Sequence, residues 1–288
     1  MEDAETPEPH GSGLAGPAPD ETGSDGLATV AHSKAGGSLN RAVLLLRAIA
    51  RGGEAGASLS ELVAWTELPR STIHRVLAML LEPRWVERDR HTRRFHLGPE
   101  FLAFGIVASA RHPIERQSAT ELAVLAGEIG QTIYLMVRSG LDGVCAARQE
   151  SVSPIQTLVL KPGSHVPLGW GAGSMAILIA LPAAEAAEII ARNRKRFAAM
   201  ASFDEAAFGK AVAAARKRGF ASHDGLFARG ISGIGVPVRG PSSYPIAAIS
   251  TAFVSDWLDD EQRLRCATRL NETARRIARR LVDIQARL

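Results

Sequence analysis

Long apolar runs and clustered cysteines are both missing from this 288-residue sequence. A helix that crosses a bilayer needs about 20 consecutive apolar residues. No stretch approaches that length, so we predict no membrane segment and a cytoplasmic protein. The two cysteines, Cys145 and Cys266, are far apart and belong to no cluster with metal-ligand spacing. We interpret them as structural thiols in a reducing compartment, with a disulfide or a metal site as the alternatives.

Motifs of common enzyme classes are also missing. There is no Gly-x-Ser-x-Gly elbow, no metal-spaced group of His, Cys and Glu, and no Walker phosphate-binding motif. His223 and Asp224 are adjacent, not spaced as a nucleophile and its base. We therefore predict that the protein is not an enzyme and that it needs no cofactor and no metal.

The first 37 residues lack an apolar run and begin with acidic residues, which excludes a signal peptide and a transit peptide. This segment is rich in Gly, Pro and Ala, and we predict that residues 1–37 are a disordered acidic extension. Seven acidic residues and one lysine give it a net charge of −6, so the remainder carries +10 within the formal total of +4. A basic body fits a nucleic-acid-binding protein, although charge alone also fits many soluble proteins.

The stretch 58–94 has the pattern of two short helices followed by a hairpin. Ser58 and Glu61 form a capping box sequence, and Pro69 suits the first turn of a second helix. In that second helix four apolar residues recur at i, i+3, i+4 and i+7, which predicts one buried stripe. They are Ile73, Val76, Leu77 and Leu80. The opposite face is polar and basic, as in a helix-turn-helix whose second helix enters the major groove of DNA.

Residues 85–87 and 93–97 are predicted to form the two strands of a wing around residues 88–92. Five arginines and two acids give this hairpin a net charge of +3 within eleven residues, which favours contact with phosphates or the minor groove. A helix pair alone is common in helical proteins, so the wing decides in favour of DNA binding. The candidate DNA-contacting residues are Arg70, Ser71, Thr72, His74, Arg75, Arg88, Arg90 and Arg93.

The run LSELVAWTELPRSTIHRVLAMLLEPRWVERDRHTRRFHLGPEFLAFG resembles the winged helix-turn-helix of IclR-type transcriptional regulators. The later pieces GSHVPLGWGAGSMAILIALP and GISGIGVPVRGPSSYPIAAIS resemble the effector-binding domain of the same family. Three departures stand out. Glu67 and Arg84 replace turn glycines, and Ser174-Met175 replace a Gly-Lys pair. Left-handed backbone at the first two positions would cost up to about 1 kcal/mol each.

The resemblance implies an α+β protein with a winged domain at residues 38–98, a linker helix at 99–112 and a GAF-like effector-binding domain at 113–288. A helix at Glu100–Ser109 is apolar nearly all round, so we expect it to pack against the same helix of a second subunit, with packing on its own domain as the alternative. The expected assembly is a homodimer on palindromic double-stranded operator DNA. A dimer of dimers remains open.

Helices in the C-terminal region are predicted at Pro113–Ile129, Ala176–Leu181, Ala183–Phe197, Asp204–Arg218 and Asp259–Leu288. Strands are predicted at Gln131–Arg138, Gly143–Gln149, Ile155–Leu160, Phe220–Ser222, Ile234–Val238 and Ile246–Phe253. The last helix has a narrow apolar seam that could form a coiled coil. Because it is one helix that closes a domain, we expect it to pack on the sheet instead. Its arginines are interpreted as a solvated face.

A glycine-rich loop at residues 163–176 runs into an apolar helix, and its backbone N–H groups suit a carboxylate or a phosphate. Gly171, Gly173 and Ala176 also match a dinucleotide fingerprint superficially. A true fingerprint follows a strand at the head of a βαβ unit, whereas the residues before this one include Pro167 and Gly169. By resemblance, the effector-binding residues are Gly171, Ala172, Gly173, Ser174, His223, Asp224, Gly233, Ser250 and Ala252. Trp170 is a candidate pocket wall, which favours a larger or aromatic acid.

Together these observations predict a ligand-responsive transcriptional repressor that controls a catabolic operon in response to a small organic acid. An activator of the same family is the alternative. An enzyme with a DNA-binding appendage and a ligand-free architectural DNA-binding protein are the competing classes.

Overall fold

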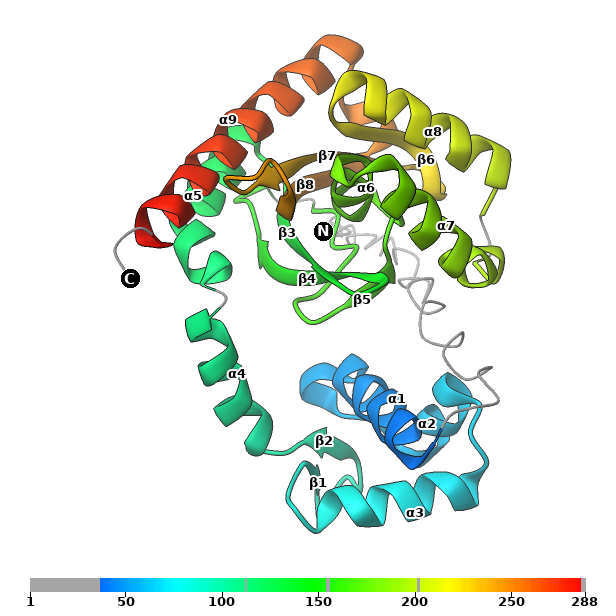
Figure 1. Ribbon diagram of the computed structural model, residues 1–288. Coiled ribbons are helices and arrows are strands. Elements are labelled where there is room, and N and C mark those ends of the chain that lie inside the picture. The colour runs from blue at the N-terminus through cyan, green and yellow to red at the C-terminus, as the bar shows by residue number, and fades with distance from the viewer. Residues whose placement is uncertain (1–36, 112, 154–155, 201–202, 286–288) are drawn as a thin grey trace, which may run out of the picture.

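The computed structural model describes residues 37–111, 113–153, 156–200 and 203–285. The predicted disorder of the N-terminal extension concerns residues that lie outside these ranges, apart from Gly37. The described chain forms two folded units, a small helical one with a hairpin and a larger one built on a sheet, joined by a single helix (Figure 1).

The N-terminal unit has the predicted winged helix-turn-helix order. Its elements are α1 (Ser38–Arg51), η2 (Gly53–Ala55), α2 (Leu59–Thr66), α3 (Arg70–Leu81), β1 (Val86–Arg88) and β2 (Phe95–Leu97). The capping box is confirmed, because the Ser58 N–H donates to Glu61 Oε2 at 2.7 Å and the Glu61 N–H donates to Ser58 Oγ at 3.3 Å. The predicted stripe of α3 is buried against Leu45 and Ile49 of α1.

Both turns that lack the expected glycine adopt left-handed backbone. Glu67 ends α2 with φ 54°, and Arg84 precedes the wing with φ 58°. The Glu67 N–H still closes the helix by donating to the Val63 carbonyl at 2.9 Å. An L-residue in this region is strained by about 1 kcal/mol. Both turns therefore keep the left-handed geometry that a glycine would favour, and Glu67 and Arg84 are strained in it.

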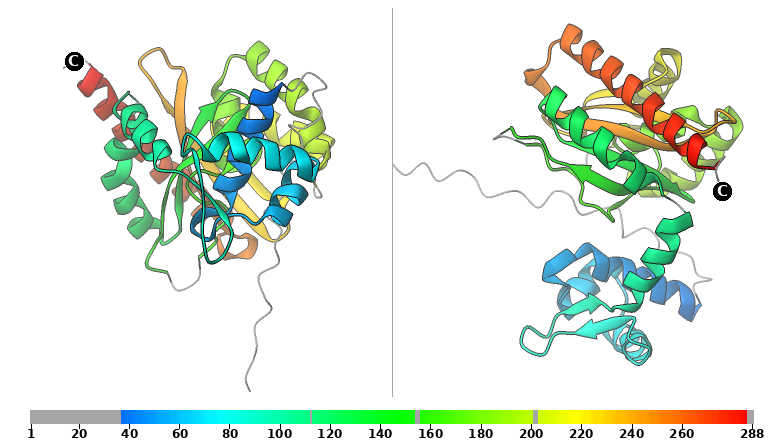
Figure 2. Two further views of the ribbon diagram at one scale, coloured as in Figure 1. Left: turned by 90° about the horizontal axis from the view of Figure 1, so that it is seen from below. Right: turned by 90° about the vertical axis from the view of Figure 1, so that its left-hand side faces the viewer.

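The connecting helix α4 (Glu100–Arg111) has no buried residue and extends two positions beyond the predicted Ser109. Phe101 and Phe104 lie edge-on to Trp85 at 5.7 and 5.8 Å, which fixes the helix to the base of the wing. Figure 2 shows α4 leaving the winged unit and running toward the sheet unit. In the single chain α4 is therefore not buried against its own domain, which was the alternative expectation.

The C-terminal unit is a six-stranded antiparallel sheet in the order β5-β4-β3-β8-β7-β6. The strands are β3 (Ile133–Ser139), β4 (Asp142–Gln149), β5 (His165–Pro167), β6 (Ala221–Ala228), β7 (Ile231–Arg239) and β8 (Pro245–Val254), with a short η3 (Ser255–Trp257) after the last. Helices α6 (Ala172–Ala180), α7 (Ala183–Ala198) and α8 (Glu205–Arg218) share a core with one face. Helices α5 (Ile114–Ile129) and α9 (Asp260–Gln285) share a core with the other face (Figure 1).

One strand prediction is wrong. Residues 156–160 of the predicted strand Ile155–Leu160 are not in a strand, and Ile155 lies outside the described ranges. The Tyr134 hydroxyl donates to the Thr157 carbonyl at 2.6 Å and accepts from the Val159 N–H at 3.1 Å. Backbone groups of this segment therefore bond a side chain instead of a neighbouring strand. The short strand β5 takes the edge position beside β4.

The last helix packs on the sheet as predicted, with Leu270 and Ile277 fully buried. The interpretation of its arginines as a solvated face is wrong for part of the helix. Arg276 and Arg280 both bind the largely buried Glu121 of α5, at 2.7 and 2.9 Å. These ion pairs join α9 to α5. No helix in the described ranges is long and apolar enough to cross a membrane.

Candidate DNA-contacting surface and effector site

The outer face of α3 is exposed and basic. Arg70, Ser71, His74 and Arg75 are exposed and Thr72 is half-buried, because the apolar stripe of the same helix points into the core. Within the described part of the chain these five side chains make no hydrogen bond or ion pair. Arg70 is the first residue of α3, at the positive end of the helix dipole, and Arg75 lies on its second turn. This face therefore presents donors and positive charge to any polyanion.

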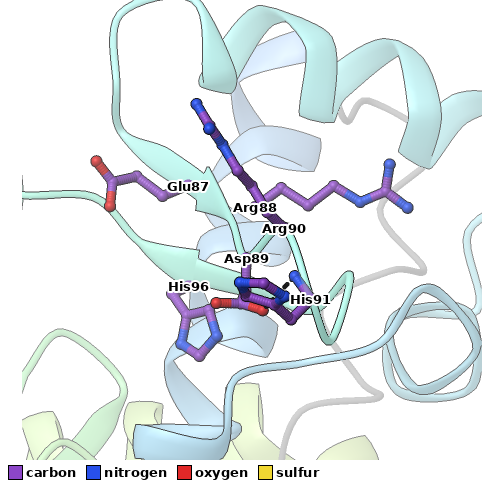
Figure 3. A pocket seen from close by; sticks show the side chains of 6 residues that line it. All are labelled: Glu87, Arg88, Asp89, Arg90, His91 and His96. Carbon is purple, nitrogen blue, oxygen red and sulfur yellow. Dashed lines mark hydrogen bonds between the residues drawn. The ribbon is translucent and has the colours of Figure 1, made fainter.

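Asp89 fixes the tip of the wing. Its Oδ1 accepts from the N–H groups of His91 and Thr92, at 2.9 and 2.6 Å, and from the Thr92 hydroxyl at 2.9 Å. The hydrogen bonds from Thr92, first of all from its backbone N–H, lower the pKa of Asp89. A concavity beside this turn is lined by Glu87, Arg88, Asp89, Arg90, His91 and His96 (Figure 3). The carboxylate of Asp89 therefore holds the turn of the wing in one conformation.

The wing arginines have different partners. Arg88 donates through Nε to the Arg93 carbonyl at 3.2 Å and lies over the Phe95 ring at 5.2 Å. The guanidinium groups of Arg90 and Arg93 make no hydrogen bond or ion pair with the residues that the structure describes. Among the described residues, the guanidinium groups of Arg90 and Arg93 thus have no partner, whereas that of Arg88 is partly held within the hairpin.

Sequence reasoning missed the role of Arg94. Its guanidinium donates to the carbonyls of Ala55 and Gly56, at 2.8 and 3.1 Å, and to Glu61 Oε2 at 2.6 Å. This arginine ties the wing to the start of α2, and it also helps to lower the pKa of Glu61 after the larger effect of Ser58. No spacing rule predicts a contact between residues so far apart in the sequence.

Five of the predicted effector-binding positions meet under α6. Ala172 and Gly173 form the first turn of α6, and Gly171 caps it with φ 81°. The helix thus begins four residues before the predicted Ala176. A Cβ added at Gly173 would lie 2.6 Å from Ser250 Oγ, and one added at Gly233 would lie 3.0 Å from Ala172 Cβ. The glycines therefore allow α6 to pack directly on β7 and β8.

The register of the sheet brings further predicted effector-binding residues to the start of α6. His223 of β6 pairs with Gly233 of β7, which pairs with Ala252 of β8. A Cβ at Gly233 would lie 2.8 Å from His223 Nε2, so the imidazole covers this glycine on the α6 side. Ser250 lies two positions before Ala252 and pairs with Gly235. Alternating residues of a strand share a face, so these side chains converge on the helix start.

Two predicted effector residues do not point into this site. The Ser174 hydroxyl accepts from the Gly169 N–H at 2.7 Å and donates to the Pro167 carbonyl at 3.2 Å, so it closes the preceding loop. Asp224 follows His223 in the strand and lies on the opposite face of the sheet, where the hydroxyl of Ser232 donates to its carboxylate. That hydrogen bond is the main cause of its lowered pKa.

His223 carries the most unusual electrostatics of the site. Its Nδ1 is enclosed and has no hydrogen-bond partner among the described residues. Burial lowers the pKa of the imidazole to about 4, against the opposing charge of Asp224. The ring is therefore neutral near pH 7, with one nitrogen available as an acceptor or a donor. An enclosed polar atom without a partner is rare unless a ligand or a water completes it.

An aromatic wall adjoins the imidazole. Phe227 lies edge-on to His223 at 4.6 Å and contacts Trp170 at 4.8 Å between ring centroids. Trp170 lies 6.5 Å from both Phe197 and Phe203. The sequence suggested Trp170 as a wall, but its aromatic neighbours come from three separate segments and were missed. The arrangement can surround an apolar ring and offer a polar atom at one side.

Metal and thiol chemistry find no support in the described residues. They contain no group of three or more His, Cys, Asp and Glu side chains placed to hold a metal ion. Cys145 and Cys266 are buried and not bonded to each other, and burial raises the pKa of both thiols to about 12. Both stay protonated at neutral pH, which suits structural residues.

Comparison with known proteins gives consistent matches in both units. Residues 107–279 match the family model "Bacterial transcriptional regulator IclR C-terminal", and residues 38–90 match "IclR helix-turn-helix domain". The chain is 30% identical over 67% of its length to a probable transcriptional regulator, SauR, of Cupriavidus necator, covering 77% of that protein. It is 26% identical over 85% of its length to the glycerol operon regulatory protein of Streptomyces coelicolor, covering 96% of that protein.

Solved structures agree on the fold. An IclR-type regulator from Alicyclobacillus acidocaldarius superposes with a TM-score of 0.66 at 20% identity, covering 84% of this chain and 98% of that one. An IclR homologue from Microbacterium hydrocarbonoxydans, solved with 4-hydroxybenzoate, has a TM-score of 0.62 at 17% identity, covering 86% and 100%. The matched families and relatives are regulators and not enzymes. The chain therefore belongs to the IclR family of DNA-binding transcriptional regulators, as the resemblance of its motifs predicted.

Proposed function

We propose that this regulator is a repressor that binds an operator through α3 and the wing and responds to a small organic acid. The main supporting observation is the exposed polar face of α3 beside a rigid, basic hairpin. We assign base and phosphate contacts on α3 to Arg70, Ser71, Thr72, His74 and Arg75. On the wing, Arg90 and Arg93 contact phosphates or the minor groove, and Arg88 contributes less because the hairpin partly holds it.

A dimer gives this surface its specificity. One winged domain makes few base contacts, and each mismatched base pair costs only about 1–3 kcal/mol, so two half-sites are needed. The side chains of Leu102, Ile106 and Val107 on α4 are 70%, 62% and 74% exposed in the single chain. Such an apolar helix is stable in water when a second copy covers it. We assign domains to residues 38–98, 99–112 and 113–288, with a cytoplasmic dimer as the working unit.

The proposed ligand lies at the N-terminal end of α6, beside the imidazole of His223. Gly171, Ala172 and Gly173 supply backbone donors for a carboxylate, and Ser250 supplies a hydroxyl. His223 forms the opposite end of the proposed ligand site, beside Gly233 and Ala252. The neutral imidazole and the aromatic wall favour an aromatic acid that carries a second polar group.

The roles of similar proteins are compatible with this proposal. One relative, 25% identical over 83% of this chain, is a transcriptional repressor, AllR, of Klebsiella pneumoniae. Two relatives regulate glycerol operons, and one structural neighbour holds 4-hydroxybenzoate. Control of a catabolic operon is the corresponding role for this chain. An activator would bind the same kind of operator, so the direction of control needs its own measurement.

The first experiment selects binding sites from random duplex DNA with the full-length protein and footprints the selected sites. We expect a palindrome with two symmetric half-sites occupied by one dimer. A single unsymmetrical half-site bound by a monomer would reject the dimer proposal. A reporter placed behind the selected site separates repression from activation.

The second experiment screens small organic acids by thermal shift, using matched aromatic and aliphatic acids and their amides. We expect an aromatic acid to raise the melting temperature and its amide to fail. The control is Arg75→Ala, which should bind DNA more weakly and keep the ligand-induced shift. If no acid stabilises the wild type while amides or neutral compounds do, the carboxylate assignment is wrong.

A further inference from the structure

A buried carboxylate of the sheet domain lies within reach of the DNA-binding domain. Asp142 begins β4, and its side chain is 7% exposed. Arg196 of α7 approaches it at 2.5 Å, His165 of β5 at 3.7 Å, and Arg47 of α1 at 3.6 Å. Burial alone would raise the pKa of Asp142, but the neighbouring imidazole of His165 and the charge of Arg196 outweigh it and lower the pKa. The group is therefore an anion at neutral pH.

The sheet domain holds this carboxylate rigidly. Asn193 of α7 donates to the Leu141 carbonyl at 2.8 Å, and the Leu168 N–H donates to the same oxygen at 2.8 Å. Arg196 also donates to Asn193 Oδ1 at 3.0 Å. The turn before Asp142 is thus fixed to α7 and to the segment after β5. Of the three side chains that approach Asp142, only that of Arg47 comes from the other domain.

We propose that Arg47 and Asp142 form a clamp that sets the orientation of the DNA-binding domain on the effector-binding domain. Helix α1 shares a core with α3, through Leu45 and Ile49, so a restraint on α1 is a restraint on the DNA-contacting helix. Figure 1 shows α1 facing the end of the sheet that carries β4 and β5. The linker helix α4 makes the covalent connection, and the clamp makes a second, reversible one.

Helix α7 connects the clamp to the aromatic wall. Phe197 follows Arg196 in the chain and stacks on Phe203 at 5.3 Å, within 6.5 Å of Trp170. A ligand that displaces these rings would move the end of α7 and change the position of Arg196 relative to Asp142. This step rests on the proposed ligand response, whereas the clamp itself does not.

The contacts make the clamp weak enough to release. Arg196 is the nearer partner of Asp142, and the Arg47 side chain is 32% exposed. A partly exposed ion pair of this kind contributes up to about 1 kcal/mol, which corresponds to an up to about 5-fold change in the ratio of clamped to released molecules. A bias of that size can be reversed by ligand binding, because allosteric couplings are typically about 5- to 150-fold.

The test measures the distance between the domains in full-length protein without DNA or ligand. Spin labels are placed at Ala64→Cys on α2 and Ala187→Cys on α7, two exposed positions, while the native cysteines are buried. Labelled protein is diluted with unlabelled protein so that distances within one chain dominate. Arg47→Glu should shift the distribution toward longer and broader distances, because it places two carboxylates together. Arg47→Lys should leave the distribution close to the wild type.

The matched control is Arg41→Glu, which makes the same charge reversal on the same helix. Its distribution should equal that of the wild type. Equal distributions for Arg47→Glu and the wild type would overturn the clamp, and so would an equal shift for Arg41→Glu. Site selection with the unlabelled wild type is independent of this result, so a failed clamp leaves the proposed DNA binding intact.

Discussion

The outer face of α3 and the face of the sheet under α6 both carry polar groups, but they are built in opposite ways. On α3 the arginines, the serine and the histidine are exposed, and their side chains make no hydrogen bond or ion pair with other described residues. Under α6 the polar atoms are enclosed, and three glycines let helix and sheet backbones approach closely. A large polyanion needs donors on an open surface, whereas a small acid needs a dry cradle. The difference predicts that substitutions on α3 change binding alone and that those under α6 also change stability.

The largest expected effect is Gly235→Ala under α6. The added Cβ would lie 2.3 Å from the Ala172 carbonyl oxygen, a backbone atom that cannot rotate away. Overpacking of this kind costs about 3 kcal/mol in the free energy of unfolding. Urea denaturation followed by circular dichroism measures it. The control Gly127→Ala lies at an exposed position of α5 with open space around it and should stabilise the protein slightly.

Protonation of His223 is expected to have the next largest effect on the free energy of unfolding. Its pKa is lowered from 6.5 to about 4, so the folded state disfavours the proton that the unfolded state binds. Stability is therefore complete above pH 6.5 and falls as the pH drops toward 4, by about 3 kcal/mol from this residue. The measurement is the free energy of unfolding against pH for the wild type and His223→Gln. Identical slopes for the two proteins between pH 4 and 6.5 would contradict the assignment.

Arg75→Ala tests the open surface on α3. We expect operator binding to weaken by about 1–3 kcal/mol and the preference between bases to relax, with the free energy of unfolding unchanged. Titration of the selected operator and of single-base variants measures both effects. Retained discrimination among the variants would place the base contact elsewhere on α3.

Neighbouring arginines of the wing separate a structural role from a DNA contact. Arg94→Ala removes the bonds to Ala55, Gly56 and Glu61, so it should destabilise the winged domain by about 1–2 kcal/mol. Arg93→Ala removes no contact among the described residues and should leave stability unchanged. Thermal unfolding of both variants decides the matter, and equal melting temperatures would mean that the Arg94 contacts contribute nothing.

The smallest expected effect is Arg90→Ala at the tip of the wing. It should weaken the operator and random DNA alike and reduce the slope of log affinity against log salt by about 1. Binding isotherms at several salt concentrations measure that slope. A selective loss for the operator would show that Arg90 contacts bases, which would blur the division between helix and wing.

Sequence reasoning went furthest where the physics is local. The capping box at Ser58 and the stripe of α3 follow from helical periodicity and capping, and the structure confirms them. The opposed faces of His223 and Asp224 could also have been predicted, because adjacent residues of a strand point to opposite sides. The resemblance alone assigns both residues to one site, whereas this rule separates them.

What the sequence determined by itself was the order of elements, the winged motif and the family, because these depend on neighbours within a few residues. Only the tertiary structure decided the roles of Arg94, Tyr134 and Asp142, whose partners lie far away in the chain. Side-chain contacts over such separations depend on how sheets, helices and domains pack, and no spacing in the sequence encodes that packing. The enclosed imidazole of His223 belongs to the same class, because its pKa depends on burial by residues from other elements.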